Sequence, residues 1–161
     1  MVSVKGLDTA RPQQWRDAAD DVVRAAKQCD GLASYARDEV ADTLKQCWAG
    51  DAGRAARAKF VKQADDYEAA AISLRALART YDDLAKDIED AQRDLRSGLD
   101  YAGRHGLKVD DSGRVDYAQP TVTAPGGEEH TELRHAHQVI TDALGKALRA
   151  DLEAARTLRA R

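Results

Sequence analysis

The chain has 161 residues, a length typical of one domain, and its formal net charge is -3. Charged residues make up 33% of it, and with one Phe, two Trp and five Tyr most of its apolar side chains are small. Such a composition excludes a thick globular core and favours narrow seams between closely packed helices. The weak negative charge argues against nucleic-acid binding. No apolar run approaches the ~20 residues that span a bilayer, and the first fifteen residues lack the apolar core of a signal peptide, so we expect a soluble chain without membrane insertion.

A first long helix is predicted to start near Thr9, with Pro12 in its first turn. Its small and apolar residues then recur in alternating steps of four and three, which is a heptad seam. The seam comprises Trp15, Ala19, Val22, Ala26, Cys29, Ala33, Ala36, Val40, Thr43 and Cys47. The Asp30-Gly31 pair lowers helix propensity without breaking this phase, so we expect one helix that can bend there.

The two cysteines, Cys29 and Cys47, lie eighteen positions apart on this predicted helix. At ~1.5 Å per residue they are roughly 27 Å apart, which is too far for an internal disulfide. We expect both to be buried small apolar residues, with an intermolecular bridge as the alternative.

A second, longer helix is predicted to begin at Asp51, which can cap it, after a stop at Gly50. Its seam comprises Ala56, Phe60, Ala64, Tyr67, Ala71, Leu74, Ala78, Tyr81, Leu84, Ile88, Ala91, Leu95 and Leu99. Five of these side chains are large for a facing seam made mostly of Ala, Val and Cys. We therefore infer a helix-pairing surface, covered by a third helix or by a second chain. It consists of Phe60, Tyr67, Leu74, Tyr81 and Ile88.

The pattern changes after residue 105. Two short extended runs, Leu107–Val109 and Arg114–Tyr117, flank a turn-forming Asp-Asp-Ser-Gly sequence and predict a small β-hairpin that must pack against a helix. A third amphipathic helix is predicted from near Glu128, and we expect it to return along the part of the second helix that extends beyond the first. Its apolar face comprises Leu133, His137, Ile140, Leu144, Leu148, Leu152, Ala155 and Leu158.

The predicted fold class is therefore all-α: a long antiparallel helical hairpin, a short β-hairpin-like segment and a third, C-terminal helix. The predicted segments are 1–105 for the helical hairpin, 106–127 for the short hairpin and linker, and 128–161 for the third helix, within one domain overall.

The turn at residues 48–51 joins the two long helices. Gly50 can adopt a left-handed conformation, and the small residues that follow let the two backbones approach closely. Trp48, a large rigid side chain, then fills the gap as a structural plug.

Trp48-Ala49-Gly50, placed between two heptad helices, resembles the W-x-G turn of the WXG helical-hairpin proteins of ESX-type, or type VII, secretion. The later β-hairpin, linker and helix resemble the extension of longer actinobacterial members.

This resemblance implies that the hairpin pairs with a second helical hairpin, as a homodimer or heterodimer, in a four-helix bundle of the coiled-coil kind. It also implies secretion by a non-Sec, type VII route as a folded dimer, with a cytoplasmic stage before export, or service as the N-terminal targeting module of a larger secreted protein. Trp48 and Gly50 would contribute a secretion-related surface. The alternative interpretation is an intracellular helical adaptor or chaperone-like scaffold without export.

Family members usually carry a Y-x-x-x-D/E motif after the second helix. No match falls there, because the fourth residue after Tyr67, Tyr81 and Tyr101 is Ala, Ala and His. Tyr35 and Glu39 have the spacing but lie inside the first predicted helix, where an ordinary pair on a helix is the simpler interpretation.

No enzymatic chemistry is predicted. His130, His135 and His137 lack the i, i+4 spacing of a zinc-binding helix, and adjacent acidic pairs diverge around a helix as a solvated face does. Neither a phosphate-binding glycine loop nor a nucleophile elbow is present in the sequence. We therefore expect a non-enzymatic protein with no cofactor, no metal and no catalytic residue.

Overall fold

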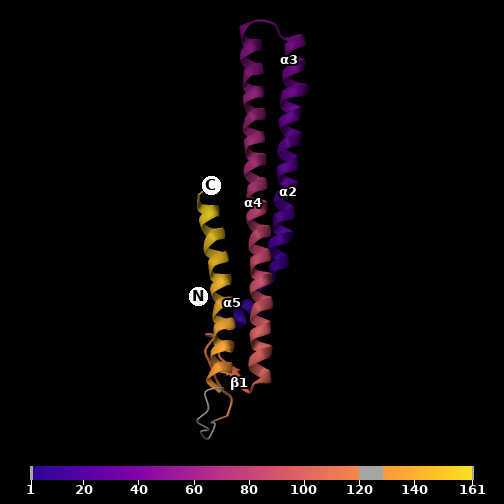
Figure 1. Ribbon diagram of the computed structural model, residues 1–161. Coiled ribbons are helices and arrows are strands. Elements are labelled where there is room, and N and C mark those ends of the chain that lie inside the picture. Colours follow the sequence, from indigo (N-terminus) through magenta and orange to yellow (C-terminus); the bar gives the residue numbers. More distant parts are fainter. Residues whose placement is uncertain (1, 120–128, 161) are drawn as a thin grey trace. The chain divides into compact units, whose positions relative to one another are not determined.

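The computed structural model describes residues 2–119 and 129–160, without the side chains of residues 129 and 130. It is mainly α-helical, with one two-stranded β-hairpin and a C-terminal helix, which confirms the predicted fold class (Figure 1). The elements are α1 (Val4–Asp8), α2 (Pro12–Ser34), the π-helix η1 (Tyr35–Val40), α3 (Ala41–Cys47), α4 (Asp51–Arg104), β1 (Leu107–Val109), β2 (Val115–Tyr117) and α5 (Glu129–Arg159). The chain divides into two compact units: unit 1 contains residues 1–15 and 83–160, and unit 2 contains residues 16–82.

Unit 2 is a helical hairpin whose seam is made of alanine. Alanines recur every seven residues on both helices, and each is at most 3% exposed. They are Ala19, Ala26 and Ala33 on α2, and Ala64, Ala71 and Ala78 on α4. Because a heptad repeat returns to the same face of a supercoiled helix, these methyl groups form two facing lines that let the backbones lie close together. The predicted narrow seam is confirmed over this part of the chain.

The predicted phase of the first seam is wrong beyond residue 36. The backbone N–H of Ala41 donates to the carbonyl of Ala36, a π-type i→i+5 bond, so η1 holds one residue more than a regular α-helix would. As a result Ala41 is buried, whereas Thr43 and Cys47 are exposed. The chain remains α-helical through Asp30-Gly31, the expected site of a bend, and the irregularity lies in η1 instead.

The expectation of two buried cysteines is also wrong, because Cys29 is half-buried and Cys47 is exposed; both are free thiols. The Cys47 thiol donates to the carbonyl of Thr43 at 2.9 Å, within its own helix. The one-residue phase change at η1 explains why Cys47 points away from the seam.

Unit 1 has a core of larger side chains. Leu95 of α4 and Ile140 of α5 are the largest fully buried residues, each with 0% exposure. Gly98 lets α5 approach α4, because a Cβ added there would lie 2.9 Å from Cγ1 of Ile140. Lys146 and Asp94 form an ion pair at 3.1 Å on the rim of this contact. As expected, α5 therefore packs along the later part of α4.

The face of α5 that is buried differs from the predicted leucine face. It consists of Ala136, Ile140, Ala143, Ala147, Ala150 and Ala154. Leu148, Leu152 and Leu158 are exposed instead. The alanine face is buried because helices that meet through small residues can pack closely. Leu148, for example, directly follows Ala147 and so lies about 100° further round the helix.

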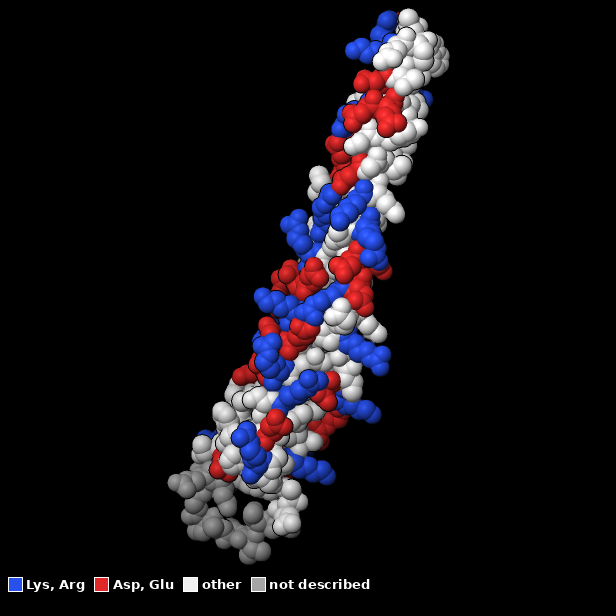
Figure 2. Space-filling view, turned by 90° about the vertical axis from the view of Figure 1, so that its right-hand side faces the viewer, with Lys and Arg blue, Asp and Glu red and all other residues white. Residues whose placement is uncertain are grey.

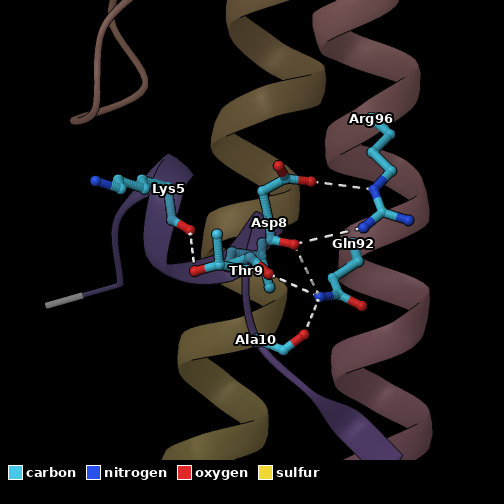
Figure 3. Close-up of polar contacts among 7 residues, drawn as sticks. Lys5, Asp8, Thr9, Ala10, Gln92 and Arg96 are labelled. Atoms are coloured by element: carbon cyan, nitrogen blue, oxygen red, sulfur yellow. Dashed lines mark hydrogen bonds and ion pairs between the residues drawn. The ribbon is translucent and has the colours of Figure 1, made fainter.

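The short helix α1 was not predicted, and polar contacts at both of its ends hold it in unit 1, among them an ion pair of Asp8 with Arg96 at 3.0 Å. Asp111, in the loop of the β-hairpin, accepts hydrogen bonds from the backbone N–H groups of Val4, at 3.0 Å, and Lys5, at 2.7 Å. At the other end, the buried amide of Gln92 donates to the carbonyls of Leu7, at 2.9 Å, and Ala10, at 2.8 Å (Figure 3). The amide thereby adds a buried donor to carbonyls at and just after the C-terminal end of α1.

The β-hairpin is present as predicted, with β1 and β2 antiparallel and Leu107 opposite Tyr117. In its loop the Asp110 carboxylate accepts from the Ser112 hydroxyl, at 2.6 Å, and from the backbone N–H of Ser112 and of Arg114. These bonds, the hydroxyl first, hold the pKa of Asp110 below its usual value. Gly113 follows with a φ of 86° and lies against Leu144 of α5, so the loop is docked on a helix.

Candidate interaction surfaces

The turn between α3 and α4 has the geometry that its sequence predicts. Trp48 ends α3 with an extended backbone (φ -135°, ψ 92°), and Gly50 has a φ of 98°, a conformation that favours glycine. Asp51 opens α4 and pairs with Arg54 one turn later. An acidic residue in the first turn also suits the helix dipole. The chain therefore reverses within three residues.

Gly53 is the residue that fixes the position of Trp48. A Cβ added to this buried glycine would collide with the Trp48 carbonyl oxygen, and would lie 2.9 Å from the carbonyl carbon and 3.3 Å from Cγ of the ring. The same carbonyl accepts from Nη1 of Arg57 at 3.2 Å. The Trp48 side chain is 47% exposed, so one part of it covers the start of α4 and the rest remains at the surface. The plug predicted from the sequence is therefore only partial.

Cross-helix ion pairs mark one edge of the unit 2 hairpin. Arg37 of η1 binds Glu68 and Asp65 of α4, the latter at 2.7 Å, and Arg75 of α4 binds Asp30 of α2. The hydrogen bond from Arg37 lowers the pKa of Glu68. Figure 2 shows Lys and Arg interleaved with Asp and Glu on the face that it presents. Alternating charge of this kind is typical of a solvated helix edge.

Large residues lie every seven positions along α4 and form what we call the pairing row: Phe60, Tyr67, Leu74, Tyr81, Ile88 and Leu95. The first five of them make up the surface inferred from the sequence. In unit 1, Ile88 is 7% and Leu95 0% exposed, and both belong to a core shared with α5. In unit 2, the four others are only half-buried. Phe60 and Tyr67 pack against Ala33, Ala36 and Ala64, whose methyl groups are too small to cover them.

Exposed leucines give unit 1 a second apolar surface. Leu148 borders an open apolar hollow of about 340 Å³ between α1, α4 and α5. Besides Leu148 it is lined by Val2, Ser3, Gly6, Leu7, Ala10, Trp15, Leu84, Ile88, Ala147 and Asp151. These side chains supply no group that would orient a small ligand, apart from one hydroxyl and one carboxylate.

The histidines show no metal-site geometry in the part of the chain that the structure describes. His135 lies edge-on to Tyr101, with ring centroids 4.7 Å apart, and His137 is exposed. The side chain of His130 falls outside the described residues. Over residues 2–119 and 129–160, no group of three or more His, Cys, Asp or Glu side chains is placed to hold a metal ion, and no helix is both long and apolar enough to cross a bilayer.

Two features of these surfaces were missed by sequence reasoning, whereas a close approach at Gly53 was expected. The π-helix left no mark in the heptad pattern, because Val40, Thr43 and Cys47 are as acceptable in a seam as the residues that follow them. The roles of Asp111 and Gln92 depend on α1, a helix of five residues that carries no periodic signal. The glycine at position 53 did carry a signal, since glycine is unfavourable inside a helix and needs a packing reason.

Comparison with models of protein families, with curated proteins and with solved structures found no match for this chain. The resemblance to WXG hairpins and to their longer members therefore rests on the sequence pattern alone.

Proposed function

We propose that this chain is a non-enzymatic helical pairing protein of a type VII, ESX-like, secretion system, acting as a secreted partner or as a targeting module. In this proposal a helical hairpin of a second chain packs along the pairing row at Phe60, Tyr67, Leu74 and Tyr81. The two chains then form a four-helix bundle, and the turn with Trp48 and Gly50 is presented to the secretion machinery.

One observation carries the pairing part of the proposal: the same heptad row is covered by a helix in unit 1 and is left half-covered in unit 2. Ile88 and Leu95 show what a complete contact looks like, since α5 supplies Ile140 and a line of alanines to them. Half-buried aromatic and leucine side chains at heptad spacing are what a further helix would bury. The partner that fits is therefore an amphipathic helix with small and branched apolar residues at heptad spacing.

The turn supports the export part of the proposal. Trp48 is held by contacts of its backbone with Gly53 and Arg57, while nearly half of its side chain remains exposed. A tryptophan that served only as a plug would be expected to bury most of its ring. An exposed aromatic residue at the tip of a helical hairpin is suited to contact with another protein.

Pairing can be tested by substitution on the row with a matched control off it. Tyr67→Glu and Leu74→Glu place a charge on the row, whereas Ile72→Glu places one about 140° further round α4 from Tyr67, at a residue that is already 67% exposed. The chain is expressed alone and with the products of neighbouring genes, and its mass is measured by light scattering. We expect a two-chain complex that survives Ile72→Glu and is lost in the other two variants, each with helical content checked by circular dichroism. A monomer in every combination, or equal loss with Ile72→Glu, would contradict the pairing surface.

Export is tested by assaying the culture medium for the chain when it is expressed with its partner. We expect the protein in the medium, and a loss in the Trp48→Ala variant although that variant still forms the complex. Retention in the cells with every candidate partner would contradict the type VII assignment and leave the pairing result standing.

A further inference from the structure

The π-helix η1 divides the first arm of the unit 2 hairpin into two segments with different phases. Up to Ala36 the seam residues are those of a regular heptad, and after η1 the seam contains Ala41 and Leu44. One residue corresponds to a rotation of about 100° and a rise of about 1.5 Å in an α-helix. If η1 became α-helical, α3 would therefore turn by that angle and advance by that rise.

The sequence of residues 40–48 offers a seam in either phase. With η1 in place, Ala41 and Leu44 face α4, and Trp48 lies against Gly53. In an all-α helix the residues at the same positions are Val40, Thr43 and Cys47, all small or β-branched and free of charge. Neither alternative buries an ionisable carboxylate or ammonium group, which would be costly.

Few contacts oppose such a rotation. Among residues 37–50 only Ala41 is buried, at 6% exposed, while Arg37, Val40 and Leu44 are partly covered. The main polar anchor of η1 is Arg37, whose partners Asp65 and Glu68 are at the surface. Segments with so little buried apolar surface open and rearrange at low free energy, and π-helical turns in α-helices often mark such points.

We propose that η1 is a one-residue register switch. Residues 41–48 exchange between the described phase, with Cys47 exposed and Trp48 against Gly53, and an all-α phase in which Cys47 enters the seam and Trp48 turns away from Gly53. The switch thus decides which side chain the hairpin presents at its turn. It is a property of the single chain and stands or falls independently of pairing and export.

The thiol of Cys47 reports the phase directly, and Cys29→Ala makes it the sole cysteine of the chain. Thr43, exposed in the described phase, would enter the seam in the other one. Thr43→Leu should therefore favour the all-α phase, and Thr43→Glu should exclude it. We expect Thr43→Leu to slow the reaction of Cys47 with a soluble aromatic disulfide at least about fivefold, because the rate falls with the population of the exposed state, and Thr43→Glu not to slow it.

Deletion of Asp38, an exposed residue of η1, supplies the control. It removes the extra residue and leaves Ala36 and Ala41 four positions apart, the spacing of a regular seam, so that no second phase exists. In this background Thr43→Leu should leave the thiol rate unchanged, which separates a phase change from local shielding by the new side chain.

Equal rates for Thr43→Leu and Thr43→Glu in the undeleted chain would overturn the proposal, as would equal slowing by Thr43→Leu with and without Asp38. If the deletion variant does not fold, the Thr43 pair still decides against the proposal when its two rates agree. When the two rates differ, adding Val40→Ala to Thr43→Leu, which weakens the all-α seam, should restore the faster reaction of the Cys47 thiol.

Discussion

The two units share one helix, α4, yet they use its surface differently. In unit 1, large residues of the pairing row meet a second helix through Leu95 and Ile140 and are buried. In unit 2, Phe60 and Tyr67 of the same row pack against a cluster of alanines and remain half-exposed. The comparison teaches that an amphipathic helix of constant pattern can have its apolar face fully covered over one stretch and only half covered over the next. What differs is the size of the side chains on the facing helix.

The two units also differ in how far their polar contacts are buried. Unit 1 places a buried amide, that of Gln92, on the carbonyls at the end of α1. Unit 2 relies on ion pairs at its surface, such as Arg37 with Glu68 and Arg75 with Asp30. Because exposed ion pairs contribute little and a satisfied buried hydrogen bond is costly to lose, we expect unit 2 to open at a lower free energy than unit 1.

Truncation of a leucine in each unit tests this comparison with the largest expected effect. Leu95→Ala removes a fully buried side chain of unit 1 and should cost about 2–5 kcal/mol, including the cavity that it leaves. Leu74→Ala removes a half-buried side chain of unit 2 and should cost about 1 kcal/mol, in proportion to the apolar area lost. Amide exchange in increasing urea measures the free energy of opening residue by residue, so each unit is assessed separately. Equal costs at the two sites would show that Leu74 is covered in solution.

Sequence reasoning was most successful where residues repeat. The alanines of unit 2 and the long α4 follow from heptad periodicity, which is a direct consequence of helix geometry. The β-hairpin followed from turn chemistry, since Asp110 and Gly113 are residue types that tight turns require. The left-handed conformation of Gly50 was predicted for the same reason.

Sequence reasoning failed where the residue pattern allows two packing arrangements. After Ala36, Val40 and Ala41 are both acceptable seam residues, and only the packing of the whole arm selects the second. On α5, leucine and alanine faces lie side by side, and the approach of α4 at Gly98 decides in favour of alanine. Tertiary contacts of this kind are absent from a pattern read along one chain.

Glycines at the closest approach in each unit provide the next test. Gly53→Ala forces a Cβ against the backbone carbonyl of Trp48, whereas Gly98→Ala forces one against side-chain atoms, Cγ1 of Ile140 and Cγ1 of Val139. A backbone cannot yield as a side chain can, so Gly53→Ala should cost about 1–3 kcal/mol in unit 2 and Gly98→Ala less in unit 1.

The matched control is Gly31→Ala. A Cβ at this position, inside α2, meets nothing within 4 Å. This variant should raise stability by about 0.5–1 kcal/mol through helix propensity. Thermal unfolding followed by circular dichroism and amide exchange measures all three variants. A neutral Gly53→Ala would mean that the turn can relax away from Trp48, as the register switch would allow.

The smallest expected effect is a pH dependence that separates the units. The Arg37 hydrogen bond lowers the pKa of Glu68 in unit 2, and the Ser112 hydroxyl lowers that of Asp110 in unit 1. A carboxyl group whose pKa is lower in the folded state binds its proton more readily when unfolded. Its contribution to stability is therefore present above the unfolded pKa and is lost as the pH falls through the folded one, from about pH 5 downward.

Glu68→Gln should flatten this acid dependence of stability for amides of unit 2 alone, and Asp110→Asn should flatten it for amides of unit 1 alone. Amide exchange between pH 3 and pH 6 measures both effects, because this window extends about one to two units around ordinary carboxyl pKa values. Both groups are exposed to solvent, so added salt should reduce the Glu68 effect, which depends on a charged partner, more than the Asp110 effect, which depends mainly on neutral donors. A Glu68→Gln variant with an unchanged acid profile in unit 2 would show that Arg37 does not hold η1 to α4 in solution. In that case the register of α3 would be set by the packing of Ala41 and Leu44 alone.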